Sequence, residues 1–592
     1  MRAMTGLGSL LLFAVLGTAC AQDFAVKVNV TGVGMLGGSL AWTKRQNRTI
    51  YQFLGVPYAN VTTRFQEPSQ PVNWTGTRNA TAYGPACVQF FSAGSSNLRH
   101  PAADVDPVLM AAAAMATRLS QSEYCLTMDI YSPNVTAKLP VLVYVHGGAF
   151  VGGSSQQVQP HYLLDHDIVL VAPQYRLGPL GFLSLQTDDV PGNAGLMDQL
   201  AALQWVHDHI SQFGGDPAKV TLAGVSAGAA SVALLQLSPL SRSPTGALFQ
   251  QVFLESGSAL APWSVEDDPL SRAAVIARSV KCTSTNKTLL AECLRNATIP
   301  ALMIGFVQSA IDDMLSGGTG LGGALPVVQT NITKPAVLGK KPLDAIRDAN
   351  FHAMPMLVGV AKHEGIMPLA LLRIYNRIIN STYGEDFYQA KTVNDLVRRV
   401  MMIEENRVAT DAVADKYFKP GTLDSLDAMR PSLIDLAGAV HFKGPALSTV
   451  EFNSKTGNTT YLYSFNHQDK YNYEAVSHGG DFPYLFPQPT LNLTTEEDSV
   501  SQKMVQLVAN FVIYGKTSAS PVGGVPEWRP YTLQDPSFLL VDKAPQLRQD
   551  FERQLTVAAS EGLRKQASAA ASGCVASVAT LLAVVAASLA FH

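Results

Sequence analysis

The sequence predicts an α/β fold, in which a large and mostly parallel central sheet carries helices on both faces. Apolar runs rich in β-branched residues, such as residues 139–145 and 168–172, are typical of buried strands. Helix-favouring stretches such as residues 197–209 alternate with these runs, and that alternation is typical of parallel sheets. Because no repeat period and no long Pro- or Ser-rich linker interrupts residues 22–566, we expect one large domain there.

A strand, a glycine-flanked serine and a helix are expected in succession at residues 220–231. The apolar run at 220–223 leads into Gly224-Val-Ser226-Ala-Gly228, and an alanine-rich segment follows. The two glycines permit a tight reversal that would hold the Ser226 hydroxyl at the N-terminus of the helix. The Gly-x-Ser-x-Gly pattern also occurs by chance, so it is the strand-turn-helix context that predicts a nucleophile.

A second glycine-rich loop follows the strand expected at 139–145 and reads His-Gly-Gly-Ala-Phe-Val-Gly-Gly over residues 146–153. Its backbone N–H groups can turn outward as donors for a tetrahedral oxyanion. An ordinary glycine-rich turn is the alternative. A phosphate-binding Walker loop is set aside because the Gly-Lys-Ser/Thr ending is missing.

Charge and cysteine spacing exclude several classes of partner. The 592-residue chain has 43 basic and 46 acidic residues, a formal net charge of −3, and no long run of either sign, so nothing indicates a nucleic-acid partner. The cysteines show neither Cys-x-x-Cys spacing nor a companion histidine cluster, so we expect no metal site, and no organic cofactor is implied. The sequence leaves the oligomeric state open and is compatible with a homo-oligomer.

The N-terminal segment predicts export. Residues 1–21 combine Arg2, a short apolar core and the small-residue ending Ala-Cys-Ala, as in a cleaved signal peptide, and the apolar run is too short to span a bilayer. Sequons of the form Asn-x-Ser/Thr favour a glycosylated, exported chain and lie at Asn29, Asn47, Asn60, Asn73, Asn79, Asn134, Asn286, Asn296, Asn331, Asn380, Asn458 and Asn492.

Four cysteines remain in the expected domain, namely Cys87, Cys125, Cys282 and Cys293. An even number in an oxidising compartment favours two disulfides, although the sequence alone allows three pairings. Sequential pairing is the simplest of the three. Each bridge would then contribute roughly 3 kcal/mol in the loop-entropy picture.

The C-terminal residues 567–592 predict membrane attachment. An apolar run ends the chain, and small residues with a short polar stretch at 561–566 precede it, which together resemble a GPI-attachment signal. A short transmembrane anchor is the alternative, but the run is short for a bilayer and no basic cluster follows it. We expect the protein in the secretory pathway, on the extracellular face of the plasma membrane through a GPI anchor, or secreted.

The chain resembles the type B carboxylesterase/cholinesterase family of α/β-hydrolases over nearly all of the expected domain. The matching stretches are FLGVPY at 53–58, SEYCL at 122–126, HGGAF at 146–150, YRLGPLGF at 175–182, NAGLMDQ at 193–199, FGGDP at 213–217 and GVSAG at 224–228. The resemblance implies an α/β-hydrolase fold and a serine esterase that acts on small-molecule esters.

The resemblance also indicates the partners of Ser226, which spacing alone would not identify. Lys-His-Glu-Gly at 362–365 is similar to the acid segment of the family and points to Glu364, and Ser-His-Gly-Gly-Asp at 477–481 points to the base His478. His363, adjacent to the expected acid, is the rival base. The oxyanion donors would be the N–H groups of Gly148, Ala149 and Ala227.

Departures from the cholinesterases favour neutral esters. The segment between Cys87 and Cys125 contains no tryptophan to bind a quaternary ammonium, but has Phe90, Phe91 and an expected helix at residues 107–119. The residue before the nucleophile, commonly glutamate in the family, is Val225.

Two alternatives stay open. Relatives in this family that have lost catalytic residues serve in cell-surface adhesion, and a choline-ester hydrolase could carry an atypical cation site. The presence of Ser226, Glu364 and His478 favours an enzyme.

Overall fold

The computed structural model describes residues 24–89, 120–243, 246–316, 318–348, 351–369, 416–418, 426–468, 475–488 and 492–561. The expected signal segment and C-terminal tail lie outside these ranges, as do Phe90, Phe91, residues 107–119 and the sequon at Asn380.

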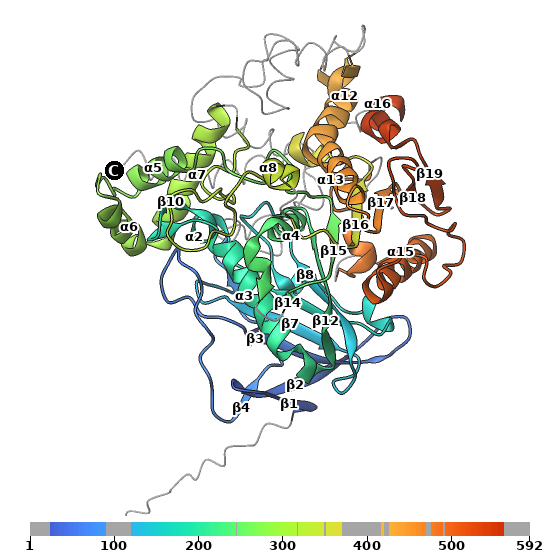
Figure 1. Ribbon diagram of the computed structural model, residues 1–592, viewed down its shortest axis with the longest axis horizontal. Helices are drawn as coiled ribbons and strands as arrows, with labels where there is room; N and C mark the ends of the chain where they lie inside the picture. Colours follow the sequence, from blue (N-terminus) through green and yellow to red (C-terminus); the bar gives the residue numbers. More distant parts are fainter. Residues whose placement is uncertain are drawn as a thin grey trace, which may run out of the picture.

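Within these ranges a sheet of 13 strands runs through the centre of the molecule (Figure 1). In spatial order its strands are β1 (Val26–Val30), β2 (Gly34–Trp42), β3 (Thr49–Pro57), β7 (Thr127–Ser132), β9 (Val169–Pro173), β8 (Leu139–Val145), β12 (Gly215–Val225), β15 (Gln251–Glu255), β16 (Met356–Ala361), β17 (Thr460–Phe465), β18 (Phe538–Val541) and β19 (Gln546–Arg548), with β4 (Thr77–Asn79) paired to β2. The predicted fold class is confirmed, and the strands expected at 139–145, 168–172 and 220–223 correspond to β8, β9 and part of β12.

The centre of the sheet is parallel and its two edges are antiparallel. All neighbours from β9 through β8, β12, β15, β16 and β17 to β18 pair in parallel. The pairs from β1 to β9 and the pair β18 with β19 are antiparallel. Residues 31–33 join β1 to β2, and residues 542–545 join β18 to β19. These connections are too short for a parallel pair, because a parallel crossover needs a dozen or more residues.

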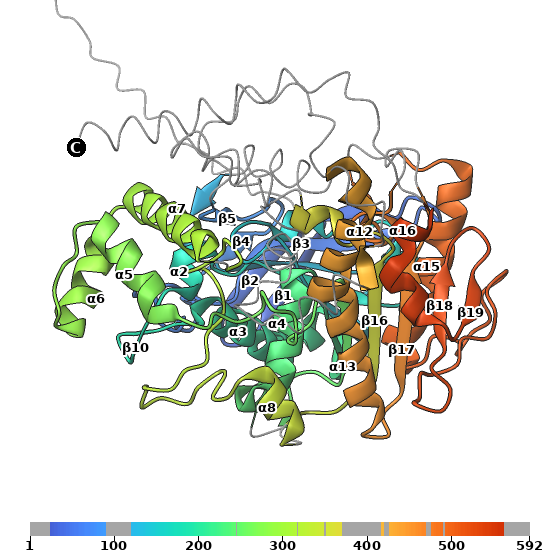
Figure 2. The ribbon, with the colours of Figure 1, turned by 90° about the horizontal axis from the view of Figure 1, so that it is seen from above.

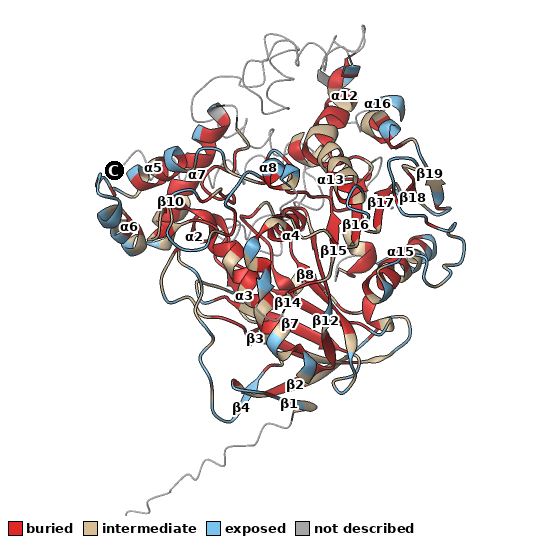
Figure 3. Cartoon of the chain, in the orientation of Figure 1, coloured by how far each residue is buried: buried red, intermediate tan, exposed pale blue. Residues whose placement is uncertain are grey.

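Alternate residues of the central strands pack on opposite faces of the sheet. Val141 and Val143 of β8 face a core that includes helices α3 (Ala194–His209) and α4 (Ala227–Leu237). Leu142 and Tyr144 face the core formed with α15 (Thr495–Tyr514). The helices therefore cover both faces, as predicted, and Figure 3 shows the strands buried between them.

Two further groups of helices lie on the left and on the right of the molecule as drawn in Figures 1 and 2. One group contains α5 (Pro269–Ser279), α6 (Lys287–Asn296) and α7 (Ile299–Leu315), and the other contains α12 (Leu426–Gly438), α13 (Gly444–Ser454) and α16 (Val557–Glu561). The shorter helices are α2 (Gly178–Phe182), α8 (Pro342–Arg347) and α14 (Phe482–Leu485). Two-stranded sheets pair β5 (Ala86–Cys87) with β6 (Gln121–Ser122), β10 (Ser184–Thr187) with β11 (Val190–Pro191), and β13 (Arg242–Ser243) with β14 (Gly246–Ala247).

Both disulfides follow the sequential pairing. Cys87 bonds to Cys125 and Cys282 bonds to Cys293, with Cα atoms 5.0 and 5.8 Å apart. Among the described residues no single helix is long and apolar enough to cross a membrane. The bent helix pair Lys287–Asn296 and Ile299–Met314 reaches the required length and apolar composition only when the two helices are taken together. The same residues contain no group of three or more His, Cys, Asp or Glu side chains placed to hold a metal ion.

Candidate active site

Ser226 lies on a strained turn between β12 and α4. Its backbone adopts φ 58° and ψ −123°, a conformation that non-glycine residues rarely occupy. A Cβ atom at Gly228 would lie 2.2 Å from the carbonyl oxygen of Val145, and one at Gly224 would lie 2.6 Å from the carbonyl carbon of Gly228. Both glycines of the motif are thus required for the close packing of strand, turn and helix, as a nucleophile elbow demands.

The glycine-rich loop after β8 lies directly against this turn. A Cβ atom at Gly147 would lie 3.0 Å from Cβ of Ser226. Gly148 and Ala149 have φ of 116° and 54°, and the carbonyl oxygen of Gly148 accepts hydrogen bonds from two N–H groups further along the loop, at 3.0 Å each. Ala227 is the first residue of α4, where helix N–H groups have no partner within the helix. The loop and the helix start therefore present backbone donors beside Ser226.

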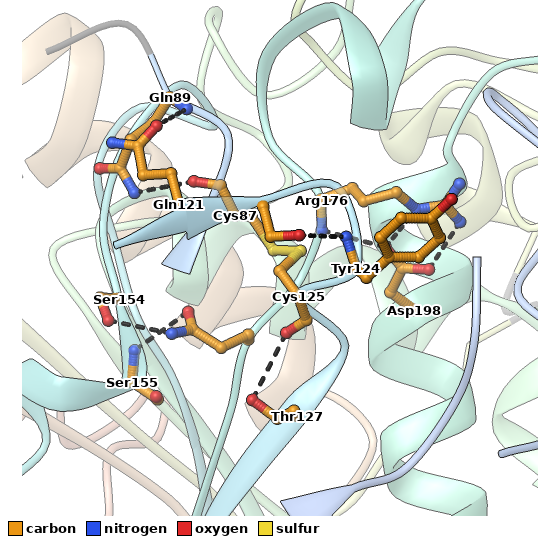
Figure 4. The surroundings of a disulfide bond; sticks show 12 residues. Cys87, Gln89, Gln121, Tyr124, Cys125, Thr127, Ser154, Ser155, Arg176 and Asp198 are labelled. Carbon is orange, nitrogen blue, oxygen red and sulfur yellow. Dashed lines mark hydrogen bonds and ion pairs between the residues drawn. A yellow bond between two sulfur atoms is a disulfide. The ribbon is translucent and has the colours of Figure 1, made fainter. Parts of the chain in front are cut away.

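Gln89 connects this loop to the first disulfide, and Figure 4 shows the surroundings of that disulfide. Its side-chain amide donates to the carbonyl oxygens of Cys87 at 3.1 Å and of Gly153 at 3.0 Å, and its amide oxygen accepts from the N–H of Gly153 at 3.1 Å. The disulfide therefore fixes the far end of the loop that carries the expected oxyanion donors.

Glu364 and His478 form a buried pair beyond the ends of β16 and β17. Nδ1 of His478 donates to Oε2 of Glu364 at 2.6 Å. The other oxygen, Oε1, accepts from the N–H of Ala361 at 2.7 Å and from the hydroxyl of Ser256 at 2.5 Å. Glu364 is fully buried, so these three donors supply the polar contacts that water would otherwise make.

His363, the rival base, bonds to the backbone of Val476. Its ring Nδ1 accepts from the backbone N–H of Val476 at 3.0 Å, and the backbone N–H of His363 donates to the carbonyl oxygen of Val476 at 2.8 Å. Val476 precedes His478 by two residues. His363 therefore aligns the chain segments that carry Glu364 and His478.

Ser256 is a site residue that the sequence reasoning missed. It directly follows β15, the strand between those that lead to Ser226 and Glu364. The N–H of Ser226 donates to the carbonyl oxygen of Glu255 at 2.8 Å, and the N–H of Ser256 donates to that of Gly359 at 2.8 Å. A polar residue at the carboxyl end of a buried parallel strand was the available signal, because ligand sites of such sheets form there.

Two further carboxyl groups lie buried beside the pair. The hydroxyl of Tyr144 donates to the carboxyl group of Glu255, and the hydroxyl of Tyr463 donates to Asp481 at 2.6 Å. Burial raises the pKa of Asp481 to about 6, although the hydrogen bond from Tyr463 opposes this change. Burial, and the nearby charge of Asp481, raise the pKa of Glu255 well above its ordinary value.

A cavity opens beside Ser226, with an empty volume of about 520 Å³ including its mouth. Its wall is mainly apolar and consists of Ala149, Ser226, Trp263, Met314, Thr319, Leu321, Met367, Pro368, His441 and Phe442. The ring of Phe442 lies 4.4 Å from the ring of His478, centroid to centroid. The structure thus brings Glu364 and His478 into direct contact, and places Ser226 in the cavity whose wall covers His478.

Sequence reasoning did not predict this wall. His441 and Phe442 lie on a π-helical turn, Ala439–Lys443, between α12 and α13, and Trp263 donates its indole N–H to the carbonyl oxygen of His441 at 3.0 Å. The widened turn inserts an extra residue locally, as is frequent at functional sites. A pattern of apolar residues within one segment could not have revealed a contact between loops so far apart in the chain.

A parallel sheet with a strained serine between strand and helix, followed along the chain by an acid and a histidine, defines the α/β-hydrolase class. Residues 23–558 match the model of the family described as the carboxylesterase family, and the chain belongs to that family. The predicted family is therefore confirmed.

The similar proteins include esterases of nearly the same length. Carboxylesterase 1D of Mus musculus is 31% identical over 517 residues, which cover 84% of this chain and 86% of that protein. Acylcarnitine hydrolase of Rattus norvegicus is 28% identical over 537 residues, or 88% of each chain. Glutactin of Drosophila melanogaster is 30% identical over 532 residues, but the match spans only 48% of its length, about half of that protein. The family and its esterase relatives support a carboxylic ester hydrolase.

Proposed function

We propose that this protein is a serine hydrolase that cleaves neutral carboxylic esters through an acyl-enzyme intermediate. Ser226 is the nucleophile, His478 the general base and Glu364 the acid that orients it. The observation that carries the proposal is the 2.6 Å bond between Glu364 and His478 beside the cavity that contains Ser226. Three such groups in the chain order Ser, Glu, His match the triad logic of this fold.

The bond between Glu364 and Nδ1 of His478 supports a definite path for each proton in this proposal. Because Nδ1 of His478 is bound to Glu364, Nε2 is the nitrogen that accepts the Ser226 proton as the hydroxyl attacks the ester carbonyl. The imidazolium then protonates the departing alcohol, and a water molecule repeats the cycle to release the acid. Glu364 stabilises the imidazolium without itself taking the proton.

The developing oxyanion would bind the N–H groups of Gly148, Ala149 and Ala227. Support comes from the left-handed backbone of Ala149 and from the position of Ala227 at the start of α4. Such donors are preorganised and carry no competing counter-charge, and removal of one typically costs about 100- to 1000-fold in rate.

Labelling with a fluorophosphonate probe tests the nucleophile. We expect the wild-type protein and Ser211→Ala, which changes an exposed serine far from the cavity, to label equally, and Ser226→Ala not to label. Equal labelling of Ser226→Ala would refute the assignment. Absence of labelling and of ester hydrolysis in the wild type would favour the alternative, a cell-surface adhesion protein.

The cavity favours a neutral substrate. Val225 takes the place of an acid before Ser226, and no acidic side chain is among the described residues that line the cavity. Trp263 supplies an aromatic face, which is the observation that keeps the choline-ester alternative open. A decisive comparison is butyrylcholine against its uncharged isostere, 3,3-dimethylbutyl butyrate. We expect kcat/KM for the neutral ester to equal or exceed that for choline, and a strong preference for choline would contradict the proposal.

We also propose that the enzyme is a glycosylated ectoenzyme held by a GPI anchor. Of the eleven sequon asparagines that the structure describes, nine are exposed, and Asn60 and Asn458 are half-buried. The two disulfides of the described chain suit an oxidising compartment. Enzymatic removal of N-glycans should lower the apparent mass. Phosphatidylinositol-specific phospholipase C should release the protein from cells, and retention would instead indicate a transmembrane tail.

A further inference from the structure

A glycine-rich loop forms part of the cavity wall and packs around the buried carboxylate of Asp313. The loop comprises residues 318–323, Gly-Thr-Gly-Leu-Gly-Gly, and follows helix α7. Thr319 and Leu321 of this loop line the cavity together with Met314 of α7. Asp313, the neighbour of Met314 on the helix, is only 6% exposed.

The loop wraps around the side chain of Asp313. Its Oδ2 accepts from the N–H of Gly320 at 2.8 Å, from the N–H of Gly322 at 3.3 Å and from the hydroxyl of Thr319 at 3.2 Å. The N–H of Gly318 donates to the backbone carbonyl of Asp313 at 2.8 Å. Gly318, Gly320 and Gly322 of the loop are therefore all bonded to Asp313 through their backbone N–H groups.

Close approach explains the glycines. A Cβ atom at Gly318 would lie 2.0 Å from Oδ1 of Asp313, and one at Gly322 would lie 2.9 Å from its Cβ. Gly320 and Gly323 have φ of 74° and 90°, which only glycine adopts without strain. A loop this rich in glycine has high conformational freedom, so bonds to fixed carboxylates restrict its position. Asp313 bonds the middle of the loop, and Glu266 accepts from the N–H of Gly323 at its end at 3.2 Å.

Arg272 connects Asp313 of α7 to the neighbouring helix α5. Its guanidinium lies 3.4 Å from Oδ1 of Asp313, and it also donates to Asp312 at 2.8 Å. Asp312 is 54% exposed in its side chain, and its carboxylate bonds to Arg272 and not to the glycines of the loop. Asp312 and Asp313 lie on the same helix and both contact Arg272, but only Asp313 bonds the glycines of the loop. Asp312 is therefore a matched control for substitutions of Asp313.

We propose that Asp313 is a positioning residue that holds residues 318–323 as a fixed wall of the substrate cavity and so favours esters with a large apolar group. The inference rests on the proposed esterase function. A wall that is already ordered binds an apolar group without a further loss of loop entropy, whereas a loosened wall must be ordered by each substrate. Acetate esters, which are too short to need this wall, should be insensitive to it.

The test compares Asp313→Asn with Asp312→Asn on p-nitrophenyl acetate and p-nitrophenyl octanoate. We expect Asp313→Asn to lower the octanoate-to-acetate ratio of kcat/KM by roughly fivefold or more, mainly through KM, with kcat for acetate nearly unchanged. Asp312→Asn should keep the wild-type ratio. A ratio unchanged in Asp313→Asn, or lowered equally in both variants, would overturn the proposal.

Hydrogen exchange gives a second measurement that does not depend on catalysis. Amides of the peptide that contains Gly320 and Gly322 should exchange faster than in the wild type in Asp313→Asn, but not in Asp312→Asn. Exchange at the wild-type rate in Asp313→Asn would contradict the proposal that Asp313 holds the loop. If Asp313→Asn fails to fold, Thr319→Val removes the hydroxyl that bonds Asp313 and accepts the N–H of Leu321 at 3.1 Å, and should shift both readouts in the same direction. A wild type inactive on both esters would refute the proposed function, while exchange still tests the anchor.

Discussion

His478 and Glu364 are joined by a 2.6 Å hydrogen bond although 114 residues separate them in the chain. The pair is held from both sides. The hydroxyl of Ser256 bonds the opposite oxygen of Glu364, and His363 bonds Val476 twice, so that the segments carrying the acid and the base are fixed to each other. The orientation of the imidazole therefore depends on residues after β15, β16 and β17 together.

The first prediction concerns the acid. Glu364→Gln keeps the size of the side chain but removes the charge that orients His478 and stabilises its protonated form. We expect kcat for p-nitrophenyl acetate to fall by about 1000-fold or more, as for triads that lose their acid. Glu67→Gln, which changes an exposed carboxylate paired with Lys334, should retain wild-type kcat. A fall of less than tenfold would argue against Glu364 as the acid.

The second prediction concerns the glycine after the nucleophile. Ala at position 228 would place its Cβ 2.2 Å from the backbone oxygen of Val145, and that oxygen belongs to a central strand that cannot move aside. We expect Gly228→Ala to lower the unfolding free energy by about 3 kcal/mol, measured by urea denaturation. Gly339→Ala, where nothing lies within 4 Å of the new Cβ, should change it little. Equal stability of the two variants would show that the elbow tolerates a side chain.

Local signals in the sequence were enough to predict the glycine-flanked turn at Ser226, because strand, turn and helix are contiguous. They were also enough for the buried central strands, whose continuous apolar runs reflect burial on both faces. The predicted start of α3 was wrong by three residues, since the helix begins at Ala194 and not at residue 197. Helix boundaries depend on capping contacts that periodicity does not encode.

Non-local contacts set the limit of what the sequence could predict. Glu364 and His478 needed the family resemblance, because the long connection from β16 to β17 separates them in the chain. Ser256, Asp481 and Trp263 were not predicted, because only the packed sheet and the adjoining loops bring them to the site. Polar residues of this kind look ordinary until their burial is known.

The third prediction concerns the disulfides. Cys87 and Cys125 are 38 residues apart, whereas Cys282 and Cys293 are 11 apart. Loop entropy then predicts stabilisation of about 4 and about 3 kcal/mol respectively. We expect the double alanine variant of the first pair to lose more unfolding free energy in urea than that of the second. It should also lose esterase activity, because Gln89 connects the first disulfide to the glycine-rich loop.

The fourth prediction concerns the pH dependence of stability and rests on Asp481. Burial raises the pKa of this carboxyl group from 3.8 to about 6 in the folded protein, so the folded state binds the proton more tightly than the unfolded state. The stability from this group is therefore fully present below about pH 4 and is lost as the pH rises through about 6. Asp481→Asn retains an oxygen to accept the hydrogen bond from Tyr463 and remains neutral at every pH.

The stability of Asp481→Asn relative to wild type should accordingly rise between about pH 4 and pH 8, by up to about 3 kcal/mol for a shift of this size. Urea denaturation at a series of pH values measures the difference. Asp550→Asn provides the comparison, because a hydrogen bond from Arg548 lowers the pKa of Asp550 and places its pH dependence below this range. We expect its difference from wild type to stay constant from about pH 4 to pH 8. A constant or falling difference for Asp481→Asn would mean that the buried carboxyl group is stabilised in its charged form, contrary to the geometry around Tyr463 and Glu364.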